Sequence, residues 1–180
     1  MKMKNILTSL LLLFCLSGAR TYAQMEAAQK VSWDLDKSVD INMEADQVWE
    51  IFSNNDLLKK ASNGYVTEIT VIDANVPVSR KIVFANGESR LENITQQEAH
   101  NKLIAIDFAD SNLPKGIKSA QYAIFIKAKD SKANVTWRGM VKGDATAKKA
   151  LIAQLTAEFE SYATGLDKMT KKVIPAARMN

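Results

Sequence analysis

The 180-residue chain contains one cysteine and one histidine, and each shortage excludes a class of chemistry. A single cysteine cannot form an intramolecular disulfide, so the domain must rely on its hydrophobic core. The histidine, His100, lies in a polar turn and gives neither a cluster of metal ligands nor a Ser-His-Asp set. A glycine-rich phosphate loop and a nucleophile elbow are also missing. We therefore expect no metal, no other cofactor and no catalytic residue.

The first 23 residues have the three-part layout of a secretory signal peptide. Lys2 and Lys4 precede an apolar run from Ile6 to Leu16, and small residues lead to a predicted cleavage site between Ala23 and Gln24. The run is shorter than the roughly 20 residues of a membrane-spanning helix, and an uncleaved anchor is the alternative interpretation. We expect an exported protein, periplasmic or secreted, with no transmembrane segment in its mature chain.

Removal of the predicted signal peptide lowers the net charge of the chain. The whole chain carries +4, and the first 23 residues hold three of its basic side chains and no acidic one, which leaves +1 for the mature protein. This charge lacks the basic excess typical of nucleic-acid binding, so no nucleic-acid partner is expected. We predict an N-terminal arm at residues 24–30, one domain at residues 31–174 and a flexible tail at residues 175–180. The sequence gives no prediction of oligomeric state.

One long segment near the C-terminus, Ala145–Val173, organises the rest of the chain. Its apolar residues recur at spacings of three and four, which predicts an amphipathic helix; they are Leu151, Leu155, Phe159, Tyr162, Leu166, Met169 and Val173. Gly165 in this helix is expected to allow close approach of the sheet or to bend the helix. The preceding sequence predicts one strand, two short helices and six further strands. One sheet must therefore wrap around one long helix, and the space between them forms an interior.

Several short motifs follow one another in an order that is more specific than any single motif. They are Ala45-Asp46-Gln47-Val48-Trp49, Val76-Pro77-Val78-Ser79-Arg80, Asn86-Gly87, Glu92-Asn93-Ile94, Leu113-Pro114 and Val135-Thr136-Trp137. In this order the chain resembles the START-like superfamily, also called helix-grip or SRPBCC, and within it the polyketide cyclase/dehydrase-like branch. The resemblance covers Val31 to Met169. It implies an α+β helix-grip fold: a curved seven-stranded antiparallel sheet around a long C-terminal helix, with two short helices after the first strand and a ligand cavity inside.

The hairpin at Asn86-Gly87 allows two strand registers. A two-residue turn places Glu92 on the outer face of the sheet, opposite Lys81. A three-residue turn with a glycine bulge instead pairs Arg80 with Glu92 on the inner face. Local turn chemistry favours the first register. The resemblance favours the second, which we adopt, because relatives place the matching charged residues toward the cavity.

The second register gives Arg80 and Glu92 two alternative roles. The pair either fixes the register of the sheet or anchors a carboxylate or hydroxyl group of a ligand. Leu113, followed by Pro114, either caps the mouth of the cavity or simply contacts the sheet. Aromatic side chains of the interior form core or cavity wall, and Arg138 is expected to point outward. The predicted ligand-binding residues are Arg80, Phe84, Glu92, Leu113, Tyr122, Trp137, Phe159 and Tyr162.

Three functions are compatible with these features. The first, which we predict, is binding of a hydrophobic small molecule or lipid by an exported domain. The second is a cyclase or dehydratase-like enzyme that uses Arg80, Glu92 and Tyr122 as polar groups in the same cavity, without a metal or nucleotide cofactor. The third is a structural domain whose interior is filled by its own side chains. The sequence does not identify the ligand.

Overall fold

The structure, a computed structural model, describes residues 32–173; the predicted signal peptide, N-terminal arm and tail lie outside this range. The described residues form seven strands: β1 (Leu35–Ile41), β2 (Val66–Asp73), β3 (Val78–Phe84), β4 (Ser89–Glu98), β5 (Leu103–Phe108), β6 (Ile117–Lys129) and β7 (Lys132–Gly143). The helices are α2 (Ala45–Ser53), α3 (Asn55–Ala61) and α4 (Ala145–Val173), with a short 3-10 turn, η1 (Asp110–Asn112), after β5.

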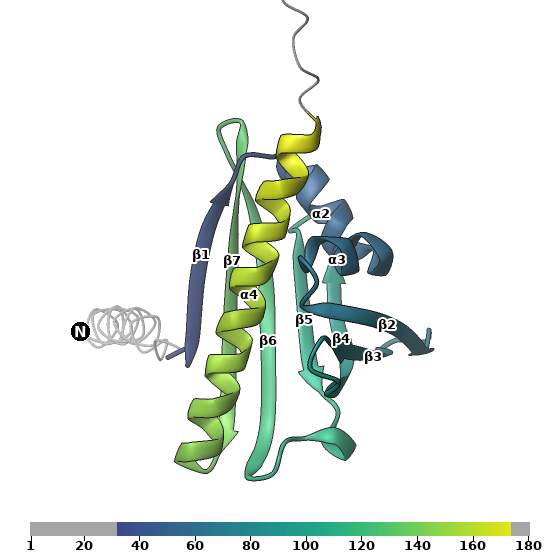
Figure 1. The fold of residues 1–180 in the computed structure, drawn as a ribbon, viewed down its shortest axis with the longest axis vertical. Helices are drawn as coiled ribbons and strands as arrows, with labels where there is room; N and C mark the ends of the chain where they lie inside the picture. The colour runs from purple at the N-terminus through teal and green to yellow at the C-terminus, as the bar shows by residue number, and fades with distance from the viewer. Residues whose placement is uncertain (1–31, 174–180) are drawn as a thin grey trace, which may run out of the picture. The chain divides into compact units, whose positions relative to one another are not determined.

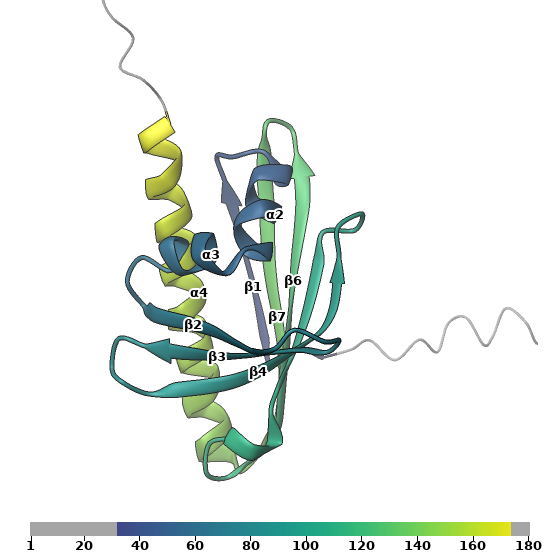
Figure 2. The same cartoon turned by 90° about the vertical axis from the view of Figure 1, so that its right-hand side faces the viewer.

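The strands form one antiparallel sheet in the order β1-β7-β6-β5-β4-β3-β2. The long helix α4 lies across one face of this sheet (Figure 1). Figure 2 shows that β2, β3 and β4 run across the direction of β6 and β7, so the sheet curls around the helix. The predicted α+β helix-grip fold, with seven strands and two short helices after β1, is confirmed.

Alternating burial explains how the sheet and α4 meet. Along β7 every second residue is buried, and these residues include Val135, Trp137 and Val141. On α4 the predicted apolar stripe is buried from Leu151 to Leu166. Each fully buried large apolar side chain contributes roughly 1.5–3 kcal/mol relative to an exposed one. Packing of the sheet against α4 therefore contributes to the stability of the fold.

The two short helices close one end of this seam. Asn54 separates them, and its side-chain oxygen accepts hydrogen bonds from the backbone N–H groups of Asp56 (2.9 Å) and Leu57 (3.1 Å), which caps α3. The chain leaves α3 through Asn63 and Gly64, which have φ values of +54° and +85°. This geometry places the side chain of Asn55 next to the sheet, where it contacts Arg80.

Gly165 lies against the end of α3. Of the two alternatives given for this glycine, close approach of the sheet is therefore wrong, because the element that approaches is α3. A Cβ atom at this position would be 1.9 Å from the carbonyl oxygen of Ala61. Two neighbouring bonds fix the same contact: Ser161 Oγ donates to the Ser62 carbonyl (2.7 Å), and Lys168 Nζ donates to Asn63 Oδ1 (2.8 Å). A glycine inside a predicted helix indicated a possible close approach, but the sequence does not show which element approaches.

We expect the substitution Gly165→Ala to lower the free energy of unfolding by about 1–3 kcal/mol, because the new methyl group would overlap backbone atoms. The usual effect inside a helix has the opposite sign, a gain of roughly 1 kcal/mol. Chemical denaturation measures the change, and Thr164→Ala, at an exposed position one residue away, is the control. A more stable Gly165→Ala protein would contradict this contact.

Candidate ligand-binding site

The β3–β4 hairpin adopts the register that pairs Arg80 with Glu92. The Phe84 N–H donates to the Glu88 carbonyl (2.9 Å) and the Gly87 N–H to the Phe84 carbonyl (3.0 Å), so three residues form the turn. Gly87 has a φ of +85°, as a glycine bulge requires. The predicted three-residue turn is confirmed, and it turns Arg80 and Glu92 to the inner face of the sheet.

Glu92 is the centre of a buried hydrogen-bond network. Its Oε2 accepts from Arg80 Nε (3.0 Å), and its Oε1 accepts from Arg90 Nε (2.7 Å) and from the Tyr122 hydroxyl (2.9 Å). Arg80 also donates to Asn55 Oδ1 (3.1 Å). The two arginines and Glu92 are each 5 % exposed or less. The carboxylate thus has partners on both oxygens.

Arg90 extends the network from the sheet to α4. Its Nη1 and Nη2 atoms donate to the two carboxylate oxygens of Glu158, at 2.8 and 2.9 Å. The guanidinium also lies over the rings of Phe84 and Phe108, at 5.0 and 4.7 Å from the ring centroids. This bidentate, stacked geometry is the kind that arginine provides and lysine does not. Sheet and helix are therefore joined by a buried ion pair.

The pKa values of the two carboxyl groups, Glu92 and Glu158, are shifted in opposite directions. Burial raises the pKa of Glu92, but Arg90 and Arg80 outweigh it and hold this pKa below its ordinary value of 4.5. Burial also raises the pKa of Glu158, and there burial and the Glu92 carboxylate prevail over Arg90 and Arg80. Burial and the nearby Glu92 carboxylate raise the pKa of the Tyr122 hydroxyl well above 10.0, so this hydroxyl stays protonated and donates to Glu92.

An aromatic cluster fills the interior beside the network. Trp137 is 1 % exposed and stacks on Tyr122, with ring centroids 5.2 Å apart. Phe159 and Tyr162 of α4 contact the same indole at 5.4 and 5.6 Å, and Phe52 of α2 closes the cluster at 6.4 Å. These rings pack against one another between the sheet and the helix.

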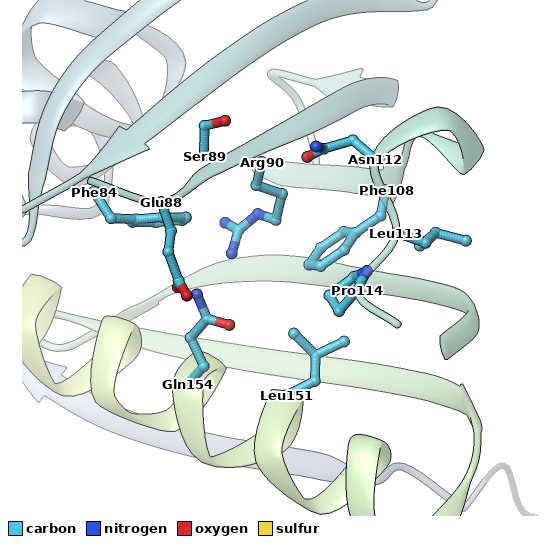
Figure 3. Close-up of a pocket in the computed structure, with 10 residues that line it drawn as sticks. All are labelled: Phe84, Glu88, Ser89, Arg90, Phe108, Asn112, Leu113, Pro114, Leu151 and Gln154. Carbon is cyan, nitrogen blue, oxygen red and sulfur yellow. The ribbon is translucent and has the colours of Figure 1, made fainter. Parts of the chain in front are cut away.

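A pocket of about 360 Å³ opens next to the cluster, between the β3–β4 hairpin, the loop after β5 and α4 (Figure 3). Its walls combine apolar and polar side chains; the lining residues are Phe84, Glu88, Ser89, Arg90, Phe108, Asn112, Leu113, Pro114, Leu151 and Gln154. Figure 3 shows the Arg90 guanidinium at the inner wall and Glu88 reaching from the hairpin toward Gln154 of α4. Arg90 therefore belongs both to the pocket and to the buried network.

The predicted site residues fall into three groups. Phe84 and Leu113 line the pocket. Arg80, Glu92 and Tyr122 form the network behind it. Trp137, Phe159 and Tyr162 form the aromatic cluster. A ligand contact for any of them stays a prediction.

Sequence reasoning missed Arg90 and Glu158, although both left a signal. Arg90 is two residues from Glu92 on the same strand, so it shares the inner face once Glu92 points inward. Glu158 follows Leu155 by three residues and precedes Tyr162 by four, which places a carboxylate within the apolar stripe of α4.

Arg138 is outside the site, as predicted, because it pairs with Asp36 on the outer face. No helix within residues 32–173 is long and apolar enough to cross a membrane.

A curved antiparallel sheet that holds a long helix, with a pocket between them, defines the helix-grip class of proteins. The chain belongs to the family described as polyketide cyclase / dehydrase and lipid transport, whose model matches residues 32–173.

Solved structures show the same fold at low sequence identity. An uncharacterised protein from Bacillus thuringiensis has a TM-score of 0.63 and 16 % identity, over 75 % of this chain and 96 % of that one. The di-domain ARO/CYC protein BexL of the BE-7585A biosynthetic pathway has a TM-score of 0.65 and 9 % identity, over 76 % of this chain and 46 % of that one. Norcoclaurine synthase from Thalictrum flavum, in complex with dopamine and hydroxybenzaldehyde, has a TM-score of 0.59 and 15 % identity, over 78 % and 87 %. The search of curated proteins found no match.

Proposed function

We propose that this protein binds a hydrophobic small molecule or lipid in the pocket between the β3–β4 hairpin, the loop after β5 and α4, and that it does so after export from the cytoplasm. The pocket carries the proposal. Its volume, about 360 Å³, lies within the range of roughly 300–1,000 Å³ typical of small-molecule sites. Phe84, Phe108, Leu113, Pro114 and Leu151 supply its apolar surface.

Three further observations support the proposal. The family description includes lipid transport, and the similar norcoclaurine synthase structure contains two small organic molecules. The leader-like first 23 residues support export. Arg80, Glu92 and Tyr122, the polar groups of the alternative enzyme, bond to one another and do not line the pocket. This arrangement favours binding over catalysis.

One purification from the native host tests both parts of the proposal. Intact mass spectrometry of the purified protein should give a chain that begins at Gln24, because the leader is removed during export. Extraction of the same sample with organic solvent should release a hydrophobic compound in a fixed molar ratio. A protein that retains Met1 contradicts export. An extract without such a compound, together with failure to bind any added apolar probe, contradicts the binding function.

The variant Leu113→Asp tests whether the compound binds in the pocket. Leu113 is half-buried and lines the mouth, so a charge there should reduce the recovered compound several-fold. Its free energy of unfolding should stay within about 0.5 kcal/mol of the wild type, as is usual near the surface. The matched control is Val76→Asp, since Val76 is 85 % exposed and lies outside the pocket. Equal recovery from both variants would show that the compound binds elsewhere.

A further inference from the structure

The pocket has two charged lining residues, and they differ in their freedom to contact a ligand. Arg90 is 5 % exposed at the inner wall, and Glu88 is exposed at the rim. The remaining polar lining residues, Ser89, Asn112 and Gln154, are neutral. The charge that a ligand meets is therefore decided by how far Arg90 and Glu88 are already neutralised.

The positive charge of Arg90 is fully compensated within the protein. Its Nε donates to Glu92, its Nη1 to Glu158, and its Nη2 to both carboxylates. Phe84 and Phe108 also lie against the guanidinium. The four charged side chains of the network, with Arg80 as the second cation, sum to zero. Arg90 thus has no free pair of N–H groups for a bidentate contact with an anion.

A carboxylate ligand would have to compete with Glu92 or Glu158 for Arg90. Both glutamates are 1 % exposed. Displacing either from Arg90 weakens or removes the compensation of a carboxylate in the interior, which is strongly unfavourable. A hydroxyl, carbonyl or amide group can bind without displacing either glutamate, because it needs one hydrogen bond and carries no charge to be neutralised.

Glu88 adds a negative charge at the rim. Its carboxylate accepts one hydrogen bond, from Asn86 Nδ2 at 3.0 Å, and no cationic side chain bonds to it among the described residues. Figure 3 shows its side chain directed across the pocket toward Gln154. A carboxylate entering here is repelled, and an amine is attracted.

On the basis of the binding function proposed above, we propose that the pocket takes hydrophobic ligands whose polar group is uncharged or cationic and that it rejects carboxylates. The sequence alone allowed a carboxylate or a hydroxyl as the ligand of Arg80 and Glu92. The compensated network, and the Glu88 carboxylate to which no described cationic side chain bonds, argue against the first of these possibilities.

The test compares decanol, decylamine and decanoate, which share one apolar chain and differ in the head group. Binding to the mature protein is measured by isothermal titration calorimetry at about pH 8, where the acid is anionic and the amine cationic. We expect decanol and decylamine to bind at least 10-fold more tightly than decanoate. In Glu88→Gln, decanoate should bind several-fold more tightly and decylamine several-fold more weakly, while decanol is unchanged. Glu160→Gln, at an exposed α4 position outside the pocket, should leave all three affinities unchanged.

The outcomes separate the two proposals. Decanoate that binds as tightly as decanol, or affinities for decanoate and decylamine that do not change in Glu88→Gln, overturns the head-group selectivity while apolar binding stands. Failure of all three compounds to bind overturns the binding function and the selectivity with it.

Discussion

The substitution Glu92→Gln is expected to lower the free energy of unfolding by about 3–5 kcal/mol, the usual cost of breaking a buried ion pair from one side. Glutamine has nearly the same shape as glutamate, so packing is preserved and the charge is removed. Arg80 and Arg90 would then share the single carboxylate of Glu158, and only Arg90 is bonded to it. One buried guanidinium is left without a counter-ion. Chemical denaturation measures the loss.

The difference in unfolding free energy between the wild type and Glu92→Gln should depend on pH, and this dependence shows whether the charge of Glu92 causes it. The pKa of Glu92 is lowered in the folded protein from an ordinary value of 4.5. Its contribution to stability is therefore complete above about pH 4.5 and is lost as the pH falls through the lower, folded value. The gap between wild type and Glu92→Gln should be constant at higher pH and shrink below this point. Glu160→Gln, an exposed substitution, should match the wild type, and an equally stable Glu92→Gln protein would show that the network is dispensable.

The substitution Phe159→Ala is expected to cost about 3–5 kcal/mol, because it opens a cavity inside the aromatic cluster. Phe159 is 6 % exposed and packs against Trp137. It does not line the pocket, so no open space is available to absorb the lost contacts. Denaturation with urea gives the change, and an unaltered urea dependence of the unfolding free energy would show that the fold is retained.

Two leucines of α4 provide the control for this argument. Leu155 is fully buried in the core, whereas Leu151, one turn earlier, is 3 % exposed and lines the pocket. Leu155→Ala should cost about 2–5 kcal/mol. Leu151→Ala should cost less, because its removal enlarges a space that already exists. Equal losses at Phe159, Leu155 and Leu151 would mean that the pocket is as tightly filled as the cluster.

The sequence by itself determined the parts of this protein that depend on local pattern. The spacing of apolar residues predicted α4 with its observed bounds, Ala145–Val173. Alternation and turn residues predicted the seven strands. The register that pairs Arg80 with Glu92 was adopted because of the resemblance, although local turn chemistry favoured the other register. The helix and the strands follow from the periods of 3.6 and 2 residues, which any short window of sequence records.

Only the tertiary structure decided which faces meet and where space remains. Arg90 and Glu158 are 68 residues apart, and their ion pair exists because the curl of the sheet brings β4 over one turn of α4. The contact of Gly165 with Ala61, in place of the sheet, depends on where α3 docks. The same curvature leaves a pocket beside Leu151 and a filled aromatic cluster around Trp137. Periodicity assigns a side chain to a face, whereas its partner across the interior is set by non-local packing of the whole sheet on the helix.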